Sequence, residues 1–418
     1  MMTTPGRICM SGSELRRFRV INNLMEKRVT TSEAALDLKI SVRQVKRLRR
    51  KVKEQGESGI IHGLVGKKSN HQLENQKEEK IISIWNEKYR AASLNFNHFT
   101  EKLNEIEKVK VSKETVRRIL RAKNLSDSKP NRGRKHRSHR ERRACFGELL
   151  QQDTSPHEWL PNQKHHLVVT VDDATSALLH CELFEHDGTI SNMTVMKKIF
   201  TEYGLCLGIY TDQAAWFHYA KQGTKLITHK SNKTPQESET QIERALNQLG
   251  IKLILAHSPQ AKGRVERMNR TLQDRLIAEL KLAGITQLKK ANWFIQNVFI
   301  PDHNKRFAKA PSNPQSAFTK LSDPKVLDEI LCQQFYSQVQ NDNTVTKVDR
   351  YRIQLLPSGK RQSWVKAKVI VRILTDGSLR IRHRMTNELI PHKVIELHLV
   401  KEAKHISIPF DGELLKAS

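Results

Sequence analysis

The sequence predicts a multidomain chain in which an all-α region, an α/β region and a small all-β region follow one another. Over the first 125 residues, apolar side chains recur at helical spacing between helix-capping sequences. From Phe146 the pattern changes to short apolar runs separated by turn-like stretches, which indicate strands. At 376–377 an Asp-Gly pair separates two alternating runs, which is a strong hairpin signal. At 418 residues, the chain is long enough for several domains.

The composition indicates a polyanionic partner. Lys and Arg total 73 against 44 Asp and Glu, which gives a formal net charge of +29. Double-stranded DNA or another nucleic acid is the simplest partner, because self-repulsion of this size would otherwise cost compactness. The alternative is a merely soluble basic protein.

Other classes of protein are disfavoured by what the sequence lacks. No apolar run reaches the roughly 18 residues of a membrane helix, and the first residues lack the apolar stretch of a secretory signal. Five scattered Cys residues without a Cys-x-x-Cys pair argue against a disulfide framework and a zinc knuckle. We therefore expect a reduced, cytoplasmic protein with no membrane partner.

Residues 1–65 predict a helix-turn-helix DNA-binding domain. Thr30 and Glu33 have the spacing of a capping box that opens a short helix, and Ser41 opens a second helix. The second helix carries an apolar stripe of Val42, Val45, Leu48 and Val52. The expected DNA contacts on its other face are Arg43, Lys46, Arg47 and Arg50, with Arg49, Lys51 and Lys53 beside them. This pattern is typical of a helix-turn-helix, and an ordinary solvated basic helix is the alternative.

Residues 66–125 predict a second helix-turn-helix-like DNA-binding domain. Its last helix follows Ser112, a plausible N-cap, and has Val116, Ile119 and Leu120 on its inner face. Outward cations on this helix are the expected DNA contacts Arg117 and Arg118, with Arg121. Two such units in series would contact a longer DNA site than one alone, each adding phosphate contacts.

Residues 126–145 predict a basic linker. The stretch 126–143 holds eight Lys or Arg against two acids and has almost nothing apolar, so it cannot bury a core. Arg134 and Lys135 are the expected DNA contacts in this segment. The linker can track a DNA groove or serve as a plain hinge, and the two roles are compatible.

Residues 146–320 predict an α/β domain with a mixed five-stranded sheet. The expected strands are the runs GELLQQDT, HHLVVTVDD, SALLHCELF, CLGIYTD and IKLILA. The expected helices cover 189–203, 241–249 and 263–283, and the polar stretch 221–240 has the composition of an inserted loop. Three hairpin-connected strands thus precede the crossover helices.

Residues 340–402 predict a small β-barrel. Two alternating runs flank the Asp-Gly turn, as expected for a hairpin. They place four cations on one face of the barrel: Arg372, Arg380, Arg382 and Arg384. That face either holds DNA or only solvates the barrel.

Three acids fall at informative places in the α/β domain. Asp153 ends the first predicted strand, Asp212 ends the fourth, and Glu266 lies in the first turns of the last helix. Glu266 lies at the edge of that helix's packing stripe, which consists of Val265, Met268, Leu272 and Leu276. Each acid alone has the features of a surface residue, so the hypothesis of a site depends on the joint pattern.

Converging carboxylates need a counter-charge, because like charges repel and raise each other's pKa. Divalent cations supply it, and hard oxygen ligands suit Mg²⁺ or Mn²⁺. Two such ions about 3.5–4 Å apart can hold both the attacking and the leaving oxygen of an in-line phosphoryl displacement. Such a loaded site can accept a phosphodiester anion.

Cations surround the acid of the last helix. The expected DNA contacts here are Lys262, Arg264, Arg267 and Arg270. Lys262, Glu266 and Arg270 have i, i+4, i+8 spacing, close to one helix face. Such cations suit a site that grips DNA phosphates, and a salt-bridge ladder on a solvated face is the alternative.

The stretch Ser258 to Arg267, within HSPQAKGRVERMNRTLQDRL, and the two strand-end Asp residues resemble the Asp-Asp-Glu catalytic core of the retroviral-integrase superfamily. More closely, the chain resembles bacterial insertion-sequence transposases of that group, in which a Ser-Pro-Gln-x-x-Gly-x-Val-Glu-Arg stretch carries the catalytic Glu. The resemblance covers much of the chain: two helix-turn-helix units, a ribonuclease H-like core from about 147 to 310, and a small β-domain.

The resemblance implies an enzyme of the bacterial cytoplasm, associated with the nucleoid, that binds the terminal inverted repeats of its element. It implies that Asp153, Asp212 and Glu266 are catalytic and bind two Mg²⁺ (or Mn²⁺) ions. It further implies cleavage of DNA at the element's ends, joining of the 3′-hydroxyls to target DNA, and at least a dimer when two ends are paired. Asp172 and Asp173 match a place where relatives often show a paired Asp, and we interpret them as turn-forming rather than catalytic.

Two rival functions remain open from the residues alone. A catalytically inactive, sequence-specific DNA-binding regulator or relic would keep the fold and show no metal-dependent cleavage. A nuclease would leave nicked ends without a joined product. The intact acids favour the transposase.

Overall fold

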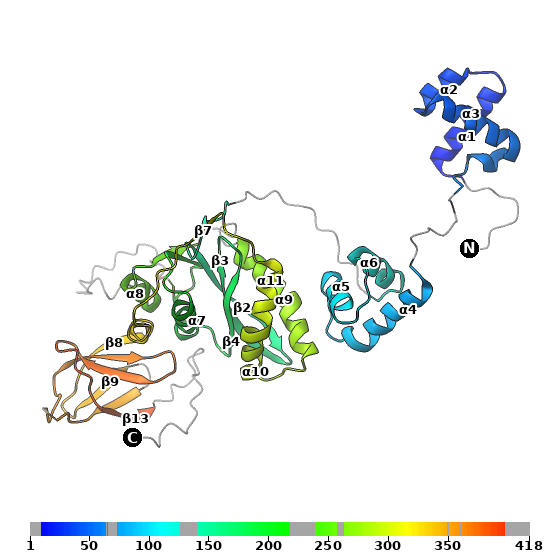
Figure 1. Cartoon of the computed structure of the whole chain (residues 1–418). Coiled ribbons are helices and arrows are strands. Elements are labelled where there is room, and N and C mark those ends of the chain that lie inside the picture. Colours follow the sequence, from blue (N-terminus) through cyan, green and yellow to red (C-terminus); the bar gives the residue numbers. More distant parts are fainter. Residues whose placement is uncertain are drawn as a thin grey trace, which may run out of the picture. The chain divides into compact units, whose positions relative to one another are not determined.

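The computed structural model describes residues 10–63, 65, 73–125, 140–217, 239–256, 263–348, 351–359 and 361–397. The chain divides into two compact units, Met1–Lys80 and Ile81–Ser418 (Figure 1). No helix of the described residues is long and apolar enough to cross a membrane. Arg134, Lys135, Lys262 and most of the predicted insert at 221–240 lie outside the described residues.

The first unit is a small helical bundle. Its elements are α1 (Gly12–Met25), α2 (Thr31–Leu38), α3 (Val42–Gln55) and the 3-10 turn η1 (Gly56–Ile60). The capping box predicted at Thr30 is present, because Thr30 accepts from the Glu33 N–H (3.3 Å) and the Glu33 carboxylate accepts from the Thr30 N–H (2.7 Å). Ser41 likewise accepts from the Gln44 N–H at 3.2 Å. These caps pair N–H groups that every helix start leaves free, so α2 and α3 begin where the sequence predicts.

The basic helix α3 buries most of its predicted apolar stripe. Val45 and Val52 are buried with Ile21 of α1 and Ala34 of α2. Val42, at the N-terminal end of the stripe, is 41% exposed. Val42 is the first residue of α3 and belongs to the turn that precedes the buried part of the helix.

Residues 75–122 form further helical segments. They are α4 (Asn75–Ile84), the π-turn η2 (Trp85–Tyr89), α5 (Phe96–Glu105) and α6 (Lys113–Ala122). Phe99 is fully buried, and its ring centroid lies 4.8 Å from that of Trp85 and 5.5 Å from that of Tyr89. Ser112 caps α6 as predicted, accepting from the Thr115 N–H at 3.2 Å. The inner face of α6 buries its predicted residues, Val116, Ile119 and Leu120.

The core of the second unit is a mixed five-stranded sheet, as predicted. Its strands are β2 (Leu150–Leu160), β3 (Gln163–Asp172), β4 (Leu178–Phe184), β5 (Gly208–Thr211) and β6 (Lys252–Leu255). Their order is β4-β3-β2-β5-β6, with antiparallel pairing among β2, β3 and β4 and parallel pairing of β5 to β2 and of β6 to β5. The element order along the chain is also the predicted one.

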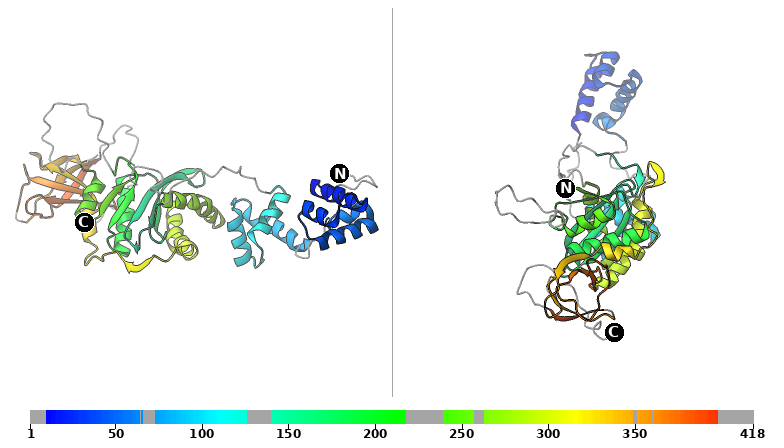
Figure 2. Two further views of the ribbon diagram at one scale, coloured as in Figure 1. Left: turned by 90° about the horizontal axis from the view of Figure 1, so that it is seen from above. Right: turned by 90° about the vertical axis from the view of Figure 1, so that its left-hand side faces the viewer.

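Helices cover both faces of this sheet. They are α7 (Thr189–Glu202) and α8 (Gln241–Gln248) on one face, and α9 (Gly263–Leu282), α10 (Leu288–Phe294), the π-turn η5 (Ile295–Phe299) and α11 (Ile300–Phe307) on the other. In Figure 1, α7 and α8 lie to the left of the sheet and α9 to α11 to its right, and Figure 2 gives two further views of the same layers. Alternate residues of β3 face opposite layers, with Val168 in one apolar cluster and Val169 in the other.

The predicted end of the first strand of the sheet, at Asp153, is wrong. Asp153 does not end the first strand, because β2 continues to Leu160 as one arm of a hairpin with β3. Its parallel pairing with β5 involves Leu150 and Gln151. Beyond that point the strand carries mostly polar residues, which is why apolar runs in the sequence did not reveal its length. Asp153 therefore lies where β2 parts from β5.

The C-terminal region contains two open sheets instead of the predicted barrel. One sheet has the order β13-β10-β9 and the other β12-β11-β8. The strands are β8 (Gln333–Gln338), β9 (Thr344–Val348), β10 (Tyr351–Leu355), β11 (Lys368–Ile373), β12 (Leu379–His383) and β13 (His392–Leu397). The barrel prediction is wrong because, in the described residues, the two sheets share an apolar core around Trp364 and Val371 without a hydrogen-bonded ladder that closes them. The predicted hairpin at the Asp-Gly turn is present as β11 and β12.

Three of the four arginines predicted on one face of the C-terminal region share a single carboxylate. Arg372 and Arg380 are directly opposite one another on β11 and β12, a like-charge pair that is unfavourable by itself. Glu329 of the short helix α12 (Val326–Ile330) accepts from Arg372, from Arg380 at 3.1 Å and from Arg382 at 3.1 Å. Burial raises the pKa of Glu329, but the hydrogen bonds and charges of these arginines outweigh burial and lower it. Part of the positive charge of this face is thus offset within the chain.

Replacing Glu329 with Gln should lower the free energy of unfolding of the second unit by about 2 kcal/mol, because three guanidinium groups lose their shared counter-charge. In wild type this stabilisation should be present above the ordinary carboxyl pKa and disappear as the pH falls through the lowered pKa of Glu329. Urea denaturation at several pH values measures both effects. Glu388→Gln, which alters an exposed carboxylate bound to Ser358, is the control and should cost less than about 0.5 kcal/mol. Equal losses in the two variants would contradict this account.

Candidate active site

The sheet brings two of the predicted acids to adjacent strands. Gln151 of β2 is paired with Tyr210 of β5, and Asp153 and Asp212 each follow two residues later. Asp153 belongs to the face covered by α9, because its carboxylate accepts from Asn269 of that helix. Asp212 is the residue that directly follows β5. Both side chains are half-buried.

A ladder of polar contacts holds β2 against α9. The Val265 N–H donates to Gln151 Oε1 at 3.2 Å. Asn269 Nδ2 donates to Asp153 Oδ2 at 2.8 Å, and Gln273 Nε2 donates to Ser155 Oγ at 3.0 Å. Alternate strand residues thus meet every fourth helix residue.

The spacing of the contacts along β2 is close to their spacing along α9. Two strand residues advance about 6.6–6.8 Å and four helix residues advance about 6 Å, so the contacts stay in register over three rungs. A helix that slid by one turn would break all three. The ladder therefore fixes the position of α9 along the strand that carries Asp153.

Glu266 is placed in the first turn of α9, as predicted, with an exposed side chain. The described residues contain no group of three or more His, Cys, Asp or Glu side chains close enough together to hold a metal ion. The structure places Asp153 on β2, Asp212 directly after the neighbouring strand β5 and Glu266 on the helix that packs against β2, without closing the three into one cluster. Residues 257–262, which precede α9, lie outside the described residues.

The donor chemistry of this region suits a hard cation. Asp153, Asp212 and Glu266 offer carboxylate oxygens, which Mg²⁺ and Mn²⁺ prefer. Beside Asp153, the Oδ1 atom of Asn269 is buried and has no hydrogen-bond partner among the described residues. An unpaired buried carbonyl oxygen is costly, so a cation or an ordered water at this place would satisfy it. Sequence reasoning missed Asn269, although its position three residues after Glu266 was the available signal.

Residues on both sides of the predicted insert at 221–240 are held by hydrogen bonds and by burial. Asp212 Oδ1 accepts from the Ala214 N–H at 3.1 Å, and Phe217 is buried in the core shared with α7 and α8. Thr240, the N-cap of α8, donates through Oγ1 to the Phe217 carbonyl at 3.3 Å. Both ends of the segment between Phe217 and Thr240 are therefore held at one place, so its length need not disturb the strand that carries Asp212.

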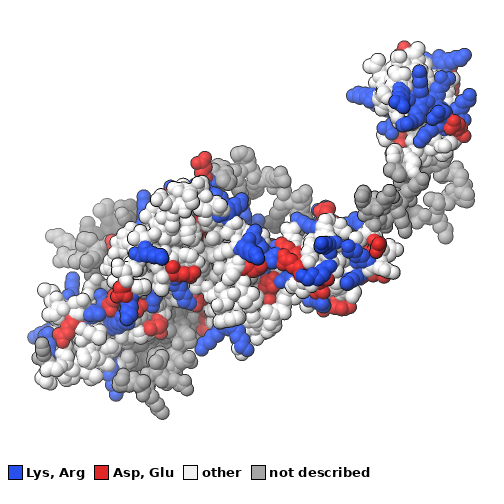
Figure 3. Space-filling view, viewed as in Figure 1, with Lys and Arg blue, Asp and Glu red and all other residues white. Residues whose placement is uncertain are grey.

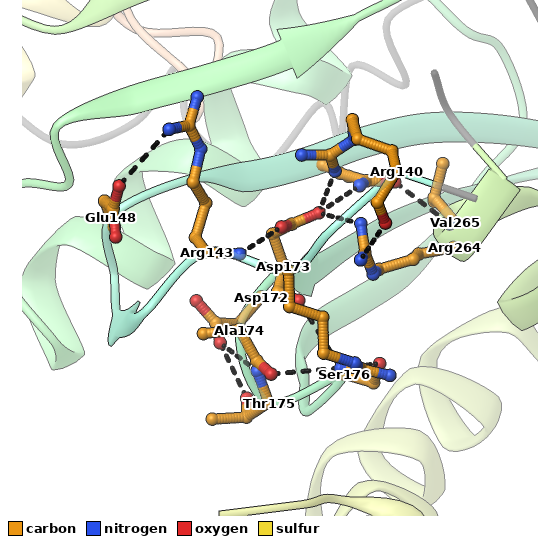
Figure 4. A network of polar contacts seen from close by, with 12 residues as sticks. Arg140, Arg143, Glu148, Asp172, Asp173, Ala174, Thr175, Ser176, Arg264 and Val265 are labelled. Carbon is orange, nitrogen blue, oxygen red and sulfur yellow. Dashed lines mark hydrogen bonds and ion pairs between the residues drawn. The ribbon is translucent and has the colours of Figure 1, made fainter. Parts of the chain in front are cut away.

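Asp172 and Asp173 have different surroundings, although both are fully buried (Figure 4). Asp172 accepts from the Gly147 N–H at 2.9 Å and from the Thr175 N–H and hydroxyl at 2.8 and 2.7 Å. These bonds hold the turn after β3. Burial raises the pKa of Asp172, and the hydrogen bonds oppose that effect. Asp173 instead pairs with Arg140 and Arg264, a contact that the sequence analysis did not anticipate.

The predicted DNA contacts differ in accessibility. The exposed ones are Arg43, Lys46, Arg47, Arg50, Arg117, Arg118, Arg267 and Arg270. The side chain of Arg264 is only 12% exposed because it pairs with Asp173. Lys and Arg, blue in Figure 3, are dense on the visible face of the first unit. Contact of any of these residues with DNA stays a prediction.

The fold and the site together define a class of protein. A mixed five-stranded sheet with helices on both faces fits an integrase-like core. Because one fold can carry several activities, the fold alone does not identify the function, and sequence relatives are needed.

Comparisons with known proteins give the family. No protein-family model matches the chain. Over 394 residues the chain is 31% identical to the protein named "Putative transposase y4bF" of Sinorhizobium fredii, covering 94% of this chain and 83% of that protein. It is 28% identical to the transposase for insertion sequence IS1202 of Streptococcus pneumoniae, covering 93% of this chain and 89% of that protein. The chain therefore belongs to the insertion-sequence transposases.

Similar solved structures are more distant. One is a chain of the simian T-cell lymphotropic virus intasome, solved by cryo-EM in complex with a PP2A regulatory subunit. Its sequence is 14% identical to this chain, and the two structures align with a TM-score of 0.30 over 75% of this chain and 97% of the intasome chain. The HTLV-2 integrase catalytic core domain in complex with magnesium is 17% identical, with a TM-score of 0.26, and covers 37% of this chain and 88% of that chain.

Replacing Asn269 with Leu should lower the free energy of unfolding by about 2 kcal/mol, because the carboxylate of Asp153 loses a buried donor and the middle rung of the ladder disappears. Chemical denaturation of the purified protein measures this loss. Asp274→Ala, on an exposed position of the same helix, is the matched control and should change stability by less than about 0.5 kcal/mol. A loss no larger than that of the control would show that the ladder does not hold α9.

Proposed function

We propose that this transposase binds the terminal inverted repeats of its element, cleaves DNA at the ends and joins the freed 3′-hydroxyls to target DNA. The observation that supports the proposal is the pairing of β2, which carries Asp153, with β5, which Asp212 follows, combined with the ladder that holds the helix of Glu266 against β2. The transposase relatives support the same reaction class. The chemistry is phosphoryl transfer at a carboxylate site.

In this proposal Asp153, Asp212 and Glu266 hold two Mg²⁺ or Mn²⁺ ions. Bound there, the ions would activate the attacking oxygen and stabilise the leaving oxygen of an in-line displacement. Asn269 keeps the Asp153 carboxylate oriented through its Nδ2 donor and keeps an oxygen atom beside it. The side chain of Glu266 is exposed in the first turn of α9 and is therefore accessible to a DNA strand.

Recognition of the element's ends is assigned to the N-terminal helices. Each of α3 and α6 buries an apolar face and exposes a row of cations, as a recognition helix in the major groove would. Arg43, Lys46, Arg47 and Arg50 lie on α3, and Arg117 and Arg118 lie on α6. The basic linker, with Arg134 and Lys135, would follow the DNA backbone between these helices and the core.

The remaining parts of the proposal concern assembly and location. Joining of two ends to one target requires two ends to be held together, so we infer at least a homodimer on DNA. A protein of net charge +29 would be bound largely to chromosomal DNA, in the nucleoid. Of the cations flanking Glu266, Lys262, Arg267 and Arg270 would lie near the DNA strand in the active site, whereas the guanidinium of Arg264 is directed to Asp173.

Purified wild-type protein should cleave a duplex copied from the element's ends in Mg²⁺ and join it to a plasmid, whereas Glu266→Gln should reduce both reactions by at least about 1000-fold, because one of the charged metal ligands is lost. Asp274→Asn, at an exposed position of the same helix outside the predicted site, is the control and should keep both reactions. Cleavage without joining would identify a nuclease. Tight binding without cleavage by wild type would favour the inactive regulator, and equal activity of Glu266→Gln would exclude this glutamate.

Replacing Arg47 or Arg118 with Gln should weaken binding to the end duplex and make its affinity less dependent on salt, because a protein that neutralises one phosphate fewer releases about one counterion fewer when it binds. Fluorescence anisotropy over a range of salt concentrations gives the slope. Arg16→Gln alters an exposed cation of α1 that is paired with Asp37, and it should leave the slope unchanged. Unchanged affinity and slope in the Arg47 and Arg118 variants would remove these residues from the interface.

A further inference from the structure

One buried carboxylate joins three separate parts of the core. Asp173 has no solvent-exposed surface, and its Oδ1 atom accepts from Arg140, from Arg264 at 2.7 Å and from Gln151 Nε2 at 2.6 Å. Its Oδ2 atom accepts from the Arg143 N–H at 2.9 Å. The donors come from the segment that enters the core, from β2 and from the first turn of α9 (Figure 4).

These contacts converge on the helix start that carries Glu266. Arg264 is the second residue of α9, and its guanidinium also donates to the Arg140 carbonyl at 3.0 Å. Gln151 bridges the same two groups, because its amide nitrogen donates to Asp173 while its amide oxygen accepts from the Val265 N–H. The two residues before Glu266 are thus anchored, one through its side chain and one through its backbone.

The first turn of a helix needs such anchoring. Its N–H groups have no partner within the helix, so a helix start frays unless other groups hold it. In α9 the Val265 N–H is one of these groups, and Gln151 supplies its acceptor. The orientation of the Gln151 amide is set by Asp173, since its nitrogen must face that carboxylate. Loss of the carboxylate would therefore free both anchors at once.

We propose that Asp173 and Arg264 are positioning residues for Glu266, so that their ion pair fixes the first turn of α9 at the distance from β2 that metal binding and cleavage need. The inference rests on the proposed function for the role of Glu266. Neither residue touches the reacting atoms. Arg264 accordingly acts through Asp173, in place of the direct DNA contact that the sequence predicts.

The chain offers a closely matched control. Asp172 is the preceding residue, is equally buried and accepts from Gly147 and Thr175, which belong to neither β2 nor α9. Asp172→Asn and Asp173→Asn make the same chemical change one residue apart. A merely structural role for both carboxylates predicts similar effects on stability and on activity.

The first test is hydrogen exchange of the full-length protein without metal or DNA. In Asp173→Asn, backbone amides of residues 265–268 should exchange about tenfold faster than in wild type, while in Asp172→Asn they should be unchanged. If Asp173→Asn fails to fold, Arg264→Lys replaces it, because Lys keeps the charge but cannot reach Asp173 and the Arg140 carbonyl together. Its control is Arg267→Lys, at an exposed position. Unchanged exchange in the Asp173 or Arg264 variant would overturn the proposal.

The second test is cleavage of the end duplex as a function of Mg²⁺ concentration. Asp173→Asn should cleave about 100-fold more slowly and need more Mg²⁺ for half-maximal rate, with unchanged affinity for the duplex. Asp172→Asn should keep the Mg²⁺ requirement of wild type. An equal loss in both variants would overturn the positioning role. Absence of cleavage by wild type, with faster exchange in Asp173→Asn, would refute the proposed function while supporting the anchored helix start.

Discussion

The rest of the structure depends on the contact between the central strand β2 and the helix α9. Three carboxylates repel one another, so a site made of them needs a frame that holds their backbones in place. The frame here is a ladder in which Gln151, Asp153 and Ser155 meet successive turns of α9. Asp153 is therefore both a predicted metal ligand and a member of the frame.

Three further polar contacts fix the positions of segments elsewhere in the second unit. Asp173 ties the start of α9 to Arg140 and Arg143, which lie shortly before β2 in the sequence. The insert after Asp212 begins and ends at one place through the bond between Thr240 and Phe217. In the C-terminal region, Glu329 is a shared counter-charge for three arginines that would otherwise repel each other. Each of these contacts is a hydrogen bond or an ion pair, which is directional and sets the relative position of two segments, whereas an apolar contact is not directional.

Much of the fold could be predicted from the sequence, because apolar periodicity and helix caps are local signals. The caps at Thr30 and Ser112, the order of the sheet elements and the hairpin at 376–377 are examples. The full length of β2 was missed because its second half is polar, and the predicted barrel was wrong because closure of a sheet depends on contacts between distant strands.

The site was predicted less completely than the fold. Asp212 and Glu266 lie where the sequence placed them, but the pairings of Asp173 and Asn269 depend on which residues the fold brings together. The central claim is that the three acids converge on two ions. Titration calorimetry of Mn²⁺ into the protein bound to an end duplex tests it most directly. The account predicts about two ions per protomer for wild type and fewer for a variant with Asp153→Asn, Asp212→Asn and Glu266→Gln combined. The same stoichiometry in both proteins would contradict it.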